Sequence, residues 1–240
     1  MDNSSPLYND EKTMTLTEHL GELRSRILWS LAALAVGTCI SSVFIDEIIA
    51  VLTAPASNLY YMRPAEAFFI YIKVALACGV LLASPVLFYE LWAFLMPALT
   101  GKERSALLLF VPGSVFLFWG GIAFAYLFVF PQGLNFFTNF AGGNIAPMLS
   151  IESYLDFFLM LVVPFGFIFN LPMVLIVLAQ MGIISSALLK KGRKYMVLAS
   201  FILAAVITPT PDIITQTLLA VPMVLLYEGS RIFIKFVLHK

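Results

Sequence analysis

Three consecutive charged residues end a hydrophobic segment of this sequence. Lys102, Glu103 and Arg104 close residues 91–104, which read Leu-Trp-Ala-Phe-Leu-Met-Pro-Ala-Leu-Thr-Gly-Lys-Glu-Arg. A charge at the centre of a bilayer costs roughly 2.5–3.5 kcal/mol on insertion scales, so three in one turn indicate a loop at a water interface. In such a loop the carboxylate of Glu103 is either a binding site for a cationic partner or simply a solvated group. Both interpretations stay open at this point.

Two further polar residues, Lys73 and Asn170, lie inside apolar runs. Intramembrane polar groups are the usual markers of a transport pathway. Lys73 is close to the end of its run, however, and its long side chain can reach the interface, which favours a structural role. Neither residue alone makes a strong case for a solute pathway.

The sequence contains no recognisable set of catalytic residues. Its two histidines, His19 and His239, each lie near an end of the chain. Phosphate-binding loops, dinucleotide-binding glycine motifs and zinc-protease motifs are also missing from the sequence. The two cysteines, Cys39 and Cys78, lie in apolar runs and have no metal-ligand spacing. We therefore expect no enzyme activity, no metal site, no cofactor and no nucleic-acid partner.

The composition indicates a membrane protein. Hydrophobic residues make up 61% of the chain and charged residues only 12%, against about 25% charged in an average soluble domain. Six apolar runs are visible, at residues 27–45, 67–88, 106–130, 154–181, 196–207 and 213–227. The sequence thus predicts an all-α polytopic membrane protein with six transmembrane helices, joined by loops at 46–66, 91–104, 131–153, 182–194 and 208–212.

Several local features refine this prediction. Leu16, Leu20, Leu23 and Ile27 recur at helical spacing and predict an amphipathic helix at 16–26. The prolines and the asparagine within 154–181 predict a bent fourth helix. The fifth and sixth runs, with 12 and 15 residues, would be only about 18 and 22 Å long. They either form a re-entrant hairpin or cross a locally thinned bilayer.

The distribution of cations predicts the orientation. With six crossings both termini lie on one side, and every Lys and Arg except Arg63 and Lys73 falls on that side. The excess of positive charge marks it as cytoplasmic. We divide the chain into a cytoplasmic N-terminal region (1–26), a six-helix transmembrane domain (27–229) and a short cytoplasmic tail (230–240).

An ordered series of short motifs resembles the TatC family, the multi-spanning subunit of the twin-arginine protein translocase. The series covers nearly all of the chain after about residue 15. It comprises His19-Leu-x-Glu22-Leu-Arg24-x-Arg26, Ala54-Pro55, Pro64-x-Glu66-x-Phe68-Phe69, Lys73, Ser84-Pro85-Val86-x-x-Tyr89-x-x-Trp92-x-Phe94, Pro97-Ala98-Leu99, Glu103-Arg104, Phe124-Ala125-Tyr126, Phe165-Gly166, Arg193-Lys194-Tyr195, Thr208-Pro209, Pro211-Asp212, Gln216, Pro222 and Tyr227-Glu228.

The resemblance implies a concave six-helix body in the cell (inner) membrane that acts as a receptor for signal peptides with paired arginines. It implies export of folded proteins driven by the proton-motive force, assembly with the single-span subunits TatA and TatB, and a homo-oligomer within the receptor complex. It also implies that Phe94, Glu103, Glu22 and Arg24 contribute to the signal-peptide site. Guanidinium groups do pair with carboxylates and stack on aromatic rings. The alternatives are a small-solute secondary transporter and a purely structural assembly subunit.

One position departs from the family pattern. Family members commonly carry a glutamate in the fourth helix where this chain has Asn170. The amide keeps the capacity to form hydrogen bonds but removes the charge. A role that requires a titrating group at this position is therefore in doubt, and a structural role for Asn170 gains weight.

Polar residues near the last turn suggest a docking surface. Thr208, Thr215 and Gln216 lie in or beside the two short runs, where a lipid-facing polar group costs free energy unless another helix satisfies it. We expect a single-span partner to dock here, although Gln216 bonding within the chain is an open alternative. Pro55 and Asp212 are expected to have structural or functional roles on the periplasmic side.

Overall fold

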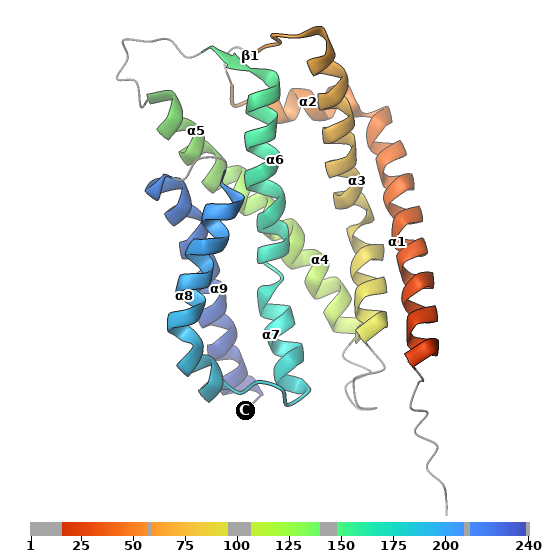
Figure 1. Ribbon diagram of the computed structural model, residues 1–240, viewed down its shortest axis with the longest axis vertical. Helices are drawn as coiled ribbons and strands as arrows, with labels where there is room; N and C mark the ends of the chain where they lie inside the picture. Colours follow the sequence, from red (N-terminus) through yellow and green to blue (C-terminus); the bar gives the residue numbers. More distant parts are fainter. Residues whose placement is uncertain (1–15, 57–58, 96–106, 140–147, 209–211, 239–240) are drawn as a thin grey trace, which may run out of the picture.

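The molecule is an almost entirely helical bundle, shown in Figure 1. This computed structural model describes residues 16–56, 59–95, 107–139, 148–208 and 212–238. The elements are α1 (Leu16–Val43), α2 (Ile45–Thr53), β1 (Leu59–Tyr60), α3 (Pro64–Leu95), α4 (Leu107–Phe124), the π-helix η3 (Ala125–Val129), α5 (Phe130–Asn139), β2 (Leu149–Ser150), α6 (Ile151–Ile168), α7 (Leu171–Gln180), α8 (Ser186–Ile207) and α9 (Ile213–Val237).

The helices pack as a series of neighbours across the bundle. α1 packs mainly on α3, α3 on α4, α4 on α6, α7 on α9, and α9 on α8. The start of α1 and the end of α9 lie at the same end of the bundle, the lower end in Figure 1, which we call the terminal end. The opposite end carries α2 and the two short strands, and we call it the strand end.

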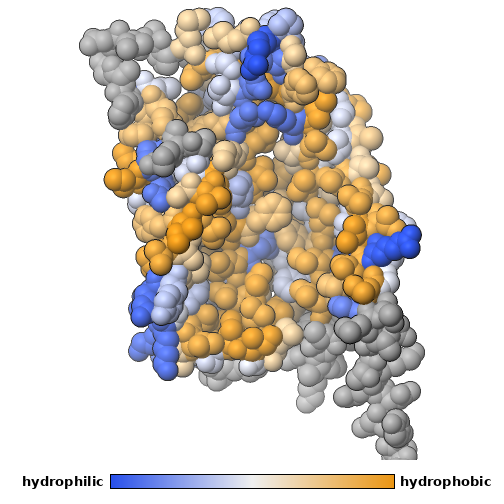
Figure 2. Space-filling view, viewed as in Figure 1, coloured by the Kyte–Doolittle hydropathy of each residue, from blue (hydrophilic) through white to orange (hydrophobic). Residues whose placement is uncertain are grey.

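The surface has the character expected of a protein in lipid. Five described segments are long and apolar enough to cross a membrane, namely His19–Val43, Pro64–Leu95, Leu109–Asn139, Ile151–Gln180 and Ile213–Val237. Large apolar side chains point outwards, including Leu28 at 56%, Phe116 at 78% and Leu225 at 66% exposure. Figure 2 shows this apolar surface over most of the visible face, with strongly hydrophilic groups gathered mainly towards its margins.

Glycines allow α1 and α3 to approach very closely. A Cβ atom added at Gly37 of α1 would lie 2.7 Å from the carbonyl oxygen of Gly79, and one added at Gly79 would lie 2.9 Å from the backbone nitrogen of Thr38. Both distances are shorter than non-bonded contacts allow. Small residues at such crossings let helices associate through backbone packing, which matters in lipid because apolar side chains gain little by leaving it.

Pro85 lies inside α3 without ending the helix. A proline has no N–H group, so the carbonyl four residues earlier, that of Leu81, loses its usual donor. The hydroxyl of Ser84 donates to this carbonyl at 2.7 Å and replaces the missing bond. The Ser84 oxygen in turn accepts from the indole nitrogen of Trp119 on α4 at 3.2 Å. The proline site therefore also links α3 to α4.

The predicted bend in the fourth run is confirmed as a break between α6 and α7 at Phe169 and Asn170. Pro172 lies in the first turn of α7, where a proline needs no N–H partner. The π-helix η3 forms a second irregularity, where the third run passes from α4 into α5.

The main core is formed by residues of α3, η3, α5, α6, α8 and α9. Phe130, with no exposed surface, packs edge-to-face on Tyr154 and Phe158, with ring centroids 5.4 and 4.9 Å away, and lies 5.7 Å from Phe157. Such aromatic pairs contribute about 0.5–1.5 kcal/mol each beyond their buried area. This cluster fixes the position of α6 against the end of the third run.

Several predicted loops are wrong in their extent. Residues 46–53 form α2, because Ile45, Ile48, Ile49 and Leu52 pack on the main core. Within the predicted loop at 131–153, α5 continues to Asn139 and α6 begins at Ile151. Residues 91–95, assigned to a cytoplasmic loop, are instead the last residues of α3.

The fifth and sixth helices are longer than their apolar runs. α8 has 22 residues and α9 has 25, about 33 and 38 Å of helix. The predicted loop at 182–194 is mostly helical, because Ser185 caps α8 by accepting from the backbone of Leu188 at 3.3 Å. α9 likewise extends into the predicted tail 230–240 as far as Val237. Only the apolar parts of these helices are short.

Candidate functional site

The terminal end of α1 and α3 brings together an arginine, two carboxylates and an aromatic ring. Arg26 donates from Nη1 to Glu90 Oε2 at 2.8 Å and from Nη2 to Glu22 Oε1 at 3.1 Å. Glu22 and Arg26 lie one turn apart on α1, whereas Glu90 comes from α3. The aromatic ring is that of Phe94 on α3, which stacks on the imidazole of His19 on α1 with ring centroids 4.5 Å apart.

These contacts place the predicted site residues as follows. Glu22 lies on α1, one turn from Arg26, and Phe94 lies on the neighbouring helix α3, where it stacks on His19. Their role in binding a signal peptide stays a prediction. Arg24, between Glu22 and Arg26 in sequence, is exposed. Glu103 lies outside the described residues, so its position relative to Glu22 stays a prediction.

A groove of about 320 Å³ lies beside the ion pair. Its polar end is formed by Arg26 and Glu90, and the rest is almost entirely apolar. The apolar lining comes from α1, α3, α4 and α6, and includes Leu23, Ile27, Phe88, Phe94, Phe118 and Phe167. Because a low-dielectric wall strengthens electrostatic interactions, a cation entering this groove would interact strongly with Glu90, the carboxylate that lines it.

The role of Glu90 is not evident from the sequence, where it appears as a single acid near the end of an apolar run. A buried acid needs a partner, and Glu90 is only 8% exposed. Its partner Arg26 is 64 residues away in the chain. The sequence contains one signal for this site. Glu22 and Arg26 are spaced at i and i+4, which places two charged groups on one face of α1, the face turned towards α3.

Asn170 has a structural role at the break between α6 and α7. Its side-chain nitrogen donates to the carbonyl of Gly166 at 3.0 Å, replacing a backbone bond at the end of α6. Its Oδ1 atom is buried and has no hydrogen-bond partner among the described residues. An ionised glutamate has no proton to donate to this carbonyl, so the amide suits this local geometry better.

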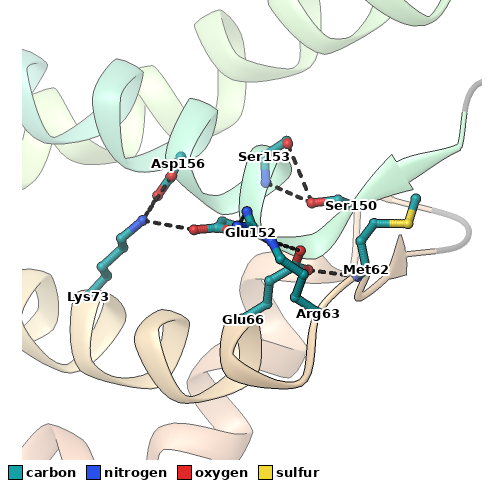
Figure 3. Close-up of polar contacts among 8 residues, drawn as sticks. All are labelled: Met62, Arg63, Glu66, Lys73, Ser150, Glu152, Ser153 and Asp156. Carbon is teal, nitrogen blue, oxygen red and sulfur yellow. Dashed lines mark hydrogen bonds and ion pairs between the residues drawn. The ribbon is translucent and has the colours of Figure 1, made fainter.

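At the strand end, ion pairs join α3 to α6 (Figure 3). Lys73 lies 2.8 Å from Asp156 Oδ1 and 3.7 Å from Glu152 Oε1, and Arg63 lies 3.3 Å from Glu152 Oε2. Glu66, 4% exposed, accepts from the backbone of Met62 at 2.9 Å. Lys73 therefore has partners on α6 that the sequence did not reveal, and these contacts favour the structural role predicted for it.

Backbone hydrogen bonds between two short strands also stabilise the strand end. β1 and β2 form a parallel pair in which Leu59 aligns with Leu149 and Tyr60 with Ser150. Pro55 is exposed in the turn after α2. The phenolic hydroxyl of Tyr154 donates to the carbonyl of Leu52 at 2.9 Å. These bonds hold the connection between α1 and α3 against α6.

The polar residues assigned to partner docking are satisfied within the chain. Gln216 donates to the carbonyl of Phe201 on α8 at 2.8 Å. The hydroxyl of Thr208, 5% exposed, donates to Ala204 at 2.9 Å. Thr215 is fully buried and donates from both its backbone nitrogen and its hydroxyl to Asp212, which caps α9. These contacts correspond to the alternative of bonding within the chain, and docking of a partner helix beside these residues stays a prediction.

A second charged cluster lies at the terminal end of α8 and α9. Glu228 of α9 pairs with Arg193 of α8 and with Arg231, the latter at 2.9 Å. The hydroxyl of Tyr227 donates to the carbonyl of Leu189 at 2.8 Å. These bonds hold the first turns of α8, which are rich in lysine and arginine, against α9. Among the described residues no group of three or more His, Cys, Asp and Glu side chains is placed to hold a metal ion.

The chain is similar to known proteins over almost its whole length. Residues 18–222 match the family model described as Sec-independent protein translocase protein (TatC). The TatC protein of Desulforapulum autotrophicum is 44% identical over 95% of this chain and 88% of its own length. The chloroplastic TATC protein of Pisum sativum is 38% identical over 97% of this chain and 67% of its own length.

A solved structure gives the same result. A crystal structure described as the twin arginine translocase receptor TatC in DDM superposes with a TM-score of 0.84. It shares 39% identity and covers 91% of this chain and 100% of its own. These matches support a protein translocase and not the alternative of a small-solute transporter. The chain belongs to the TatC family of Sec-independent protein translocases.

Proposed function

We propose that this chain is the signal-peptide receptor and core subunit of a twin-arginine translocase that exports folded proteins by using the proton-motive force. The observation that carries the proposal is the group of Glu22, Glu90 and Phe94 at the terminal end, beside an apolar groove. A carboxylate can accept two parallel hydrogen bonds from a guanidinium, and an aromatic ring can stack on its plane. The apolar groove suits the hydrophobic part of a peptide.

Glu103 is expected to supply a further carboxylate to this site. An exposed ion pair contributes only about 0–1 kcal/mol. Selective binding of two adjacent arginines therefore requires several carboxylates in a partly desolvated setting. Glu22, with its side chain 20% exposed, and Glu90, at 10%, meet the desolvation requirement.

The proposal is tested by Glu22→Gln and Glu103→Gln. Each change removes one charge with little change of shape, and a hydrogen bond to a charged group contributes about 1.5–3 kcal/mol. We expect cross-linking of a twin-arginine signal peptide to weaken at least about tenfold in each variant. The matched control is Glu47→Gln, which removes an exposed carboxylate at the strand end. Unchanged cross-linking in both test variants would refute the receptor assignment.

We also propose that the terminal end faces the cytoplasm of a cell with the chain in its inner membrane. The support is the distribution of described cations: Arg63 and Lys73 lie at the strand end, and all the others lie at the terminal end, namely Arg24, Arg26, Lys190, Lys191, Arg193, Lys194, Arg231 and Lys235. The positive-inside rule assigns the richer end to the cytoplasm.

Thiol labelling tests this orientation. In a chain without Cys39 and Cys78, we expect Pro55→Cys to react with a membrane-impermeant reagent added to intact cells. Ile183→Cys, in the exposed connection between α7 and α8, should react only after permeabilisation. The reverse pattern would invert the proposed orientation.

Assembly with TatA-type and TatB-type single-span subunits, and a homo-oligomer within the receptor complex, complete the proposal. The exposed apolar face of α8, with Leu198, Ile202 and Val206, offers a surface for such a helix. Docking here would depend on close packing between helices and not on Thr208, Thr215 or Gln216.

A further inference from the structure

Arg26 is shared between two carboxylates that come from different helices. Its two terminal nitrogens point to different partners, Nη1 to Glu90 and Nη2 to Glu22. A guanidinium beside a single carboxylate usually binds both carboxylate oxygens through two parallel hydrogen bonds. The position of Glu90 on α3 prevents this arrangement, because it draws Nη1 away from Glu22.

The consequence for Glu22 is one unoccupied oxygen. Oε1 accepts from Arg26, whereas Oε2 is buried and has no hydrogen-bond partner in the described part of the chain. Leaving a buried charged acceptor without a hydrogen-bond donor is unfavourable. The cluster also has two negative charges and one positive charge. The three side chains therefore have a net charge of −1 and one buried carboxylate oxygen without a donor among the described residues. One further cation would supply both the missing charge and the missing hydrogen bond.

The groove lies next to this position, although Glu22 itself does not line it. Arg26, Glu90 and Phe94 line it together with Leu23, the neighbour of Glu22 in sequence. Apart from two serines its remaining lining is apolar, so water competes weakly for the carboxylate. A guanidinium satisfies this site better than an ammonium, because it is more weakly hydrated and presents a planar fork of donors.

We propose that Glu90 is a positioning residue for signal-peptide recognition: by holding Arg26, it keeps Glu22 Oε2 open as the acceptor for one arginine of the incoming peptide. This inference rests on the proposed receptor function. Arg26 therefore competes with the peptide arginine for the oxygens of Glu22, and its hydrogen bond to Glu90 limits this competition. Without Glu90, Arg26 would turn both terminal nitrogens onto Glu22 and occupy the oxygen that the peptide needs.

A pair of variants separates this role from a merely structural one. The full chain is purified in detergent, and its affinity for a synthetic twin-arginine signal peptide is measured. Glu90→Gln is expected to weaken binding about tenfold, since the neutral amide attracts Arg26 less than the carboxylate does and Arg26 then turns both terminal nitrogens onto Glu22. The double variant Glu90→Gln with Arg26→Gln lacks the competitor, so its affinity is expected to return to within about threefold of the unaltered chain.

A structural role predicts the opposite for the double variant. If the ion pair only holds α1 to α3, removing both partners leaves binding as weak as in Glu90→Gln or weaker, and that result would overturn the proposal. Glu47→Gln is the matched control, since it removes an exposed carboxylate at the strand end by the same type of substitution. It is expected to leave peptide affinity unchanged, which makes a general effect of charge distinguishable from a local one.

Two further measurements complete the test. If Glu90→Gln does not fold, Arg26→Gln alone is used with a twin-lysine peptide. Removing Arg26 leaves Glu22 and Glu90 without their arginine partner, which should raise binding of the twin-lysine peptide severalfold. Unchanged binding would count against the proposal. Glu22→Gln distinguishes the two levels of inference. Normal twin-arginine binding in Glu22→Gln, with or without an effect of Glu90→Gln, refutes the site at Glu22. Weakened binding in Glu22→Gln with normal binding in Glu90→Gln refutes only the positioning role.

Discussion

Replacing Gly79 with leucine is expected to force α1 away from α3 and destabilise the protein by about 3 kcal/mol or more. Even a single Cβ atom at this position would lie 2.9 Å from the backbone nitrogen of Thr38 and would also overlap the Thr38 side chain. Backbone atoms cannot move aside without shifting the whole helix. Because α1 packs mainly on α3, little else would hold it in place. The proposed signal-peptide binding should therefore be lost together with stability.

The matched control is Gly120→Leu on α4, where an added Cβ atom meets no atom within 4 Å. Leucine favours helix over glycine by up to about 1 kcal/mol, so this control should keep or slightly raise stability. The measurement is thermal unfolding in detergent, followed by size-exclusion chromatography of the folded fraction. Equal midpoints for the two leucine variants would contradict the close packing of α1 on α3.

Replacing Phe130 with alanine is expected to lower the free energy of unfolding by about 3 kcal/mol. This value is at the lower end for buried aromatic residues, because a side chain in lipid gains from packing but little from leaving water. Phe130 has no exposed surface and contacts the rings of Tyr154, Phe157 and Phe158 on α6. Its removal would leave a cavity in the main core.

Phe128→Ala provides the comparison for Phe130. Phe128 is 61% exposed and lies two residues earlier in the same helical segment, so its removal changes mainly contacts with lipid. We expect a shift in unfolding temperature several times smaller than that of Phe130→Ala. Similar shifts for the two variants would mean that the aromatic cluster does not hold α6 against the third run.

The sequence predicted the apolar runs, a bend within the fourth run and the helical character of residues 16–26, because each depends on local composition or on proline chemistry. It did not predict α2 or α5. Both are short helices in segments of mixed polarity, and their stability comes from packing on the core, as Ile45 and Phe130 show. The extension of α8 through Lys190 to Lys194 was missed because charges at the membrane interface are as compatible with helix as with loop.

The candidate site was predictable only in part. Glu22 and Phe94 follow from the motifs, and the structure brings their helices together. Glu90 could not be assigned, since its partner comes from another helix and no local pattern specifies that pairing. The same holds for Lys73, whose partner Asp156 is 83 residues away. Ion pairs between distant segments are tertiary information, which neither composition nor periodicity contains.

The π-helix η3 has a consequence for the lengths of related sequences. Each π-type hydrogen bond closes a loop one residue larger than an α-type bond, so the segment Ala125–Val129 accommodates about one residue more than a regular turn. Deletion of a single residue here would leave a regular α-helix with the flanking helices still in register. A relative one residue shorter between Phe124 and Phe130 could thus keep the same bundle, whereas a deletion inside α4 would rotate every residue that follows by about 100°.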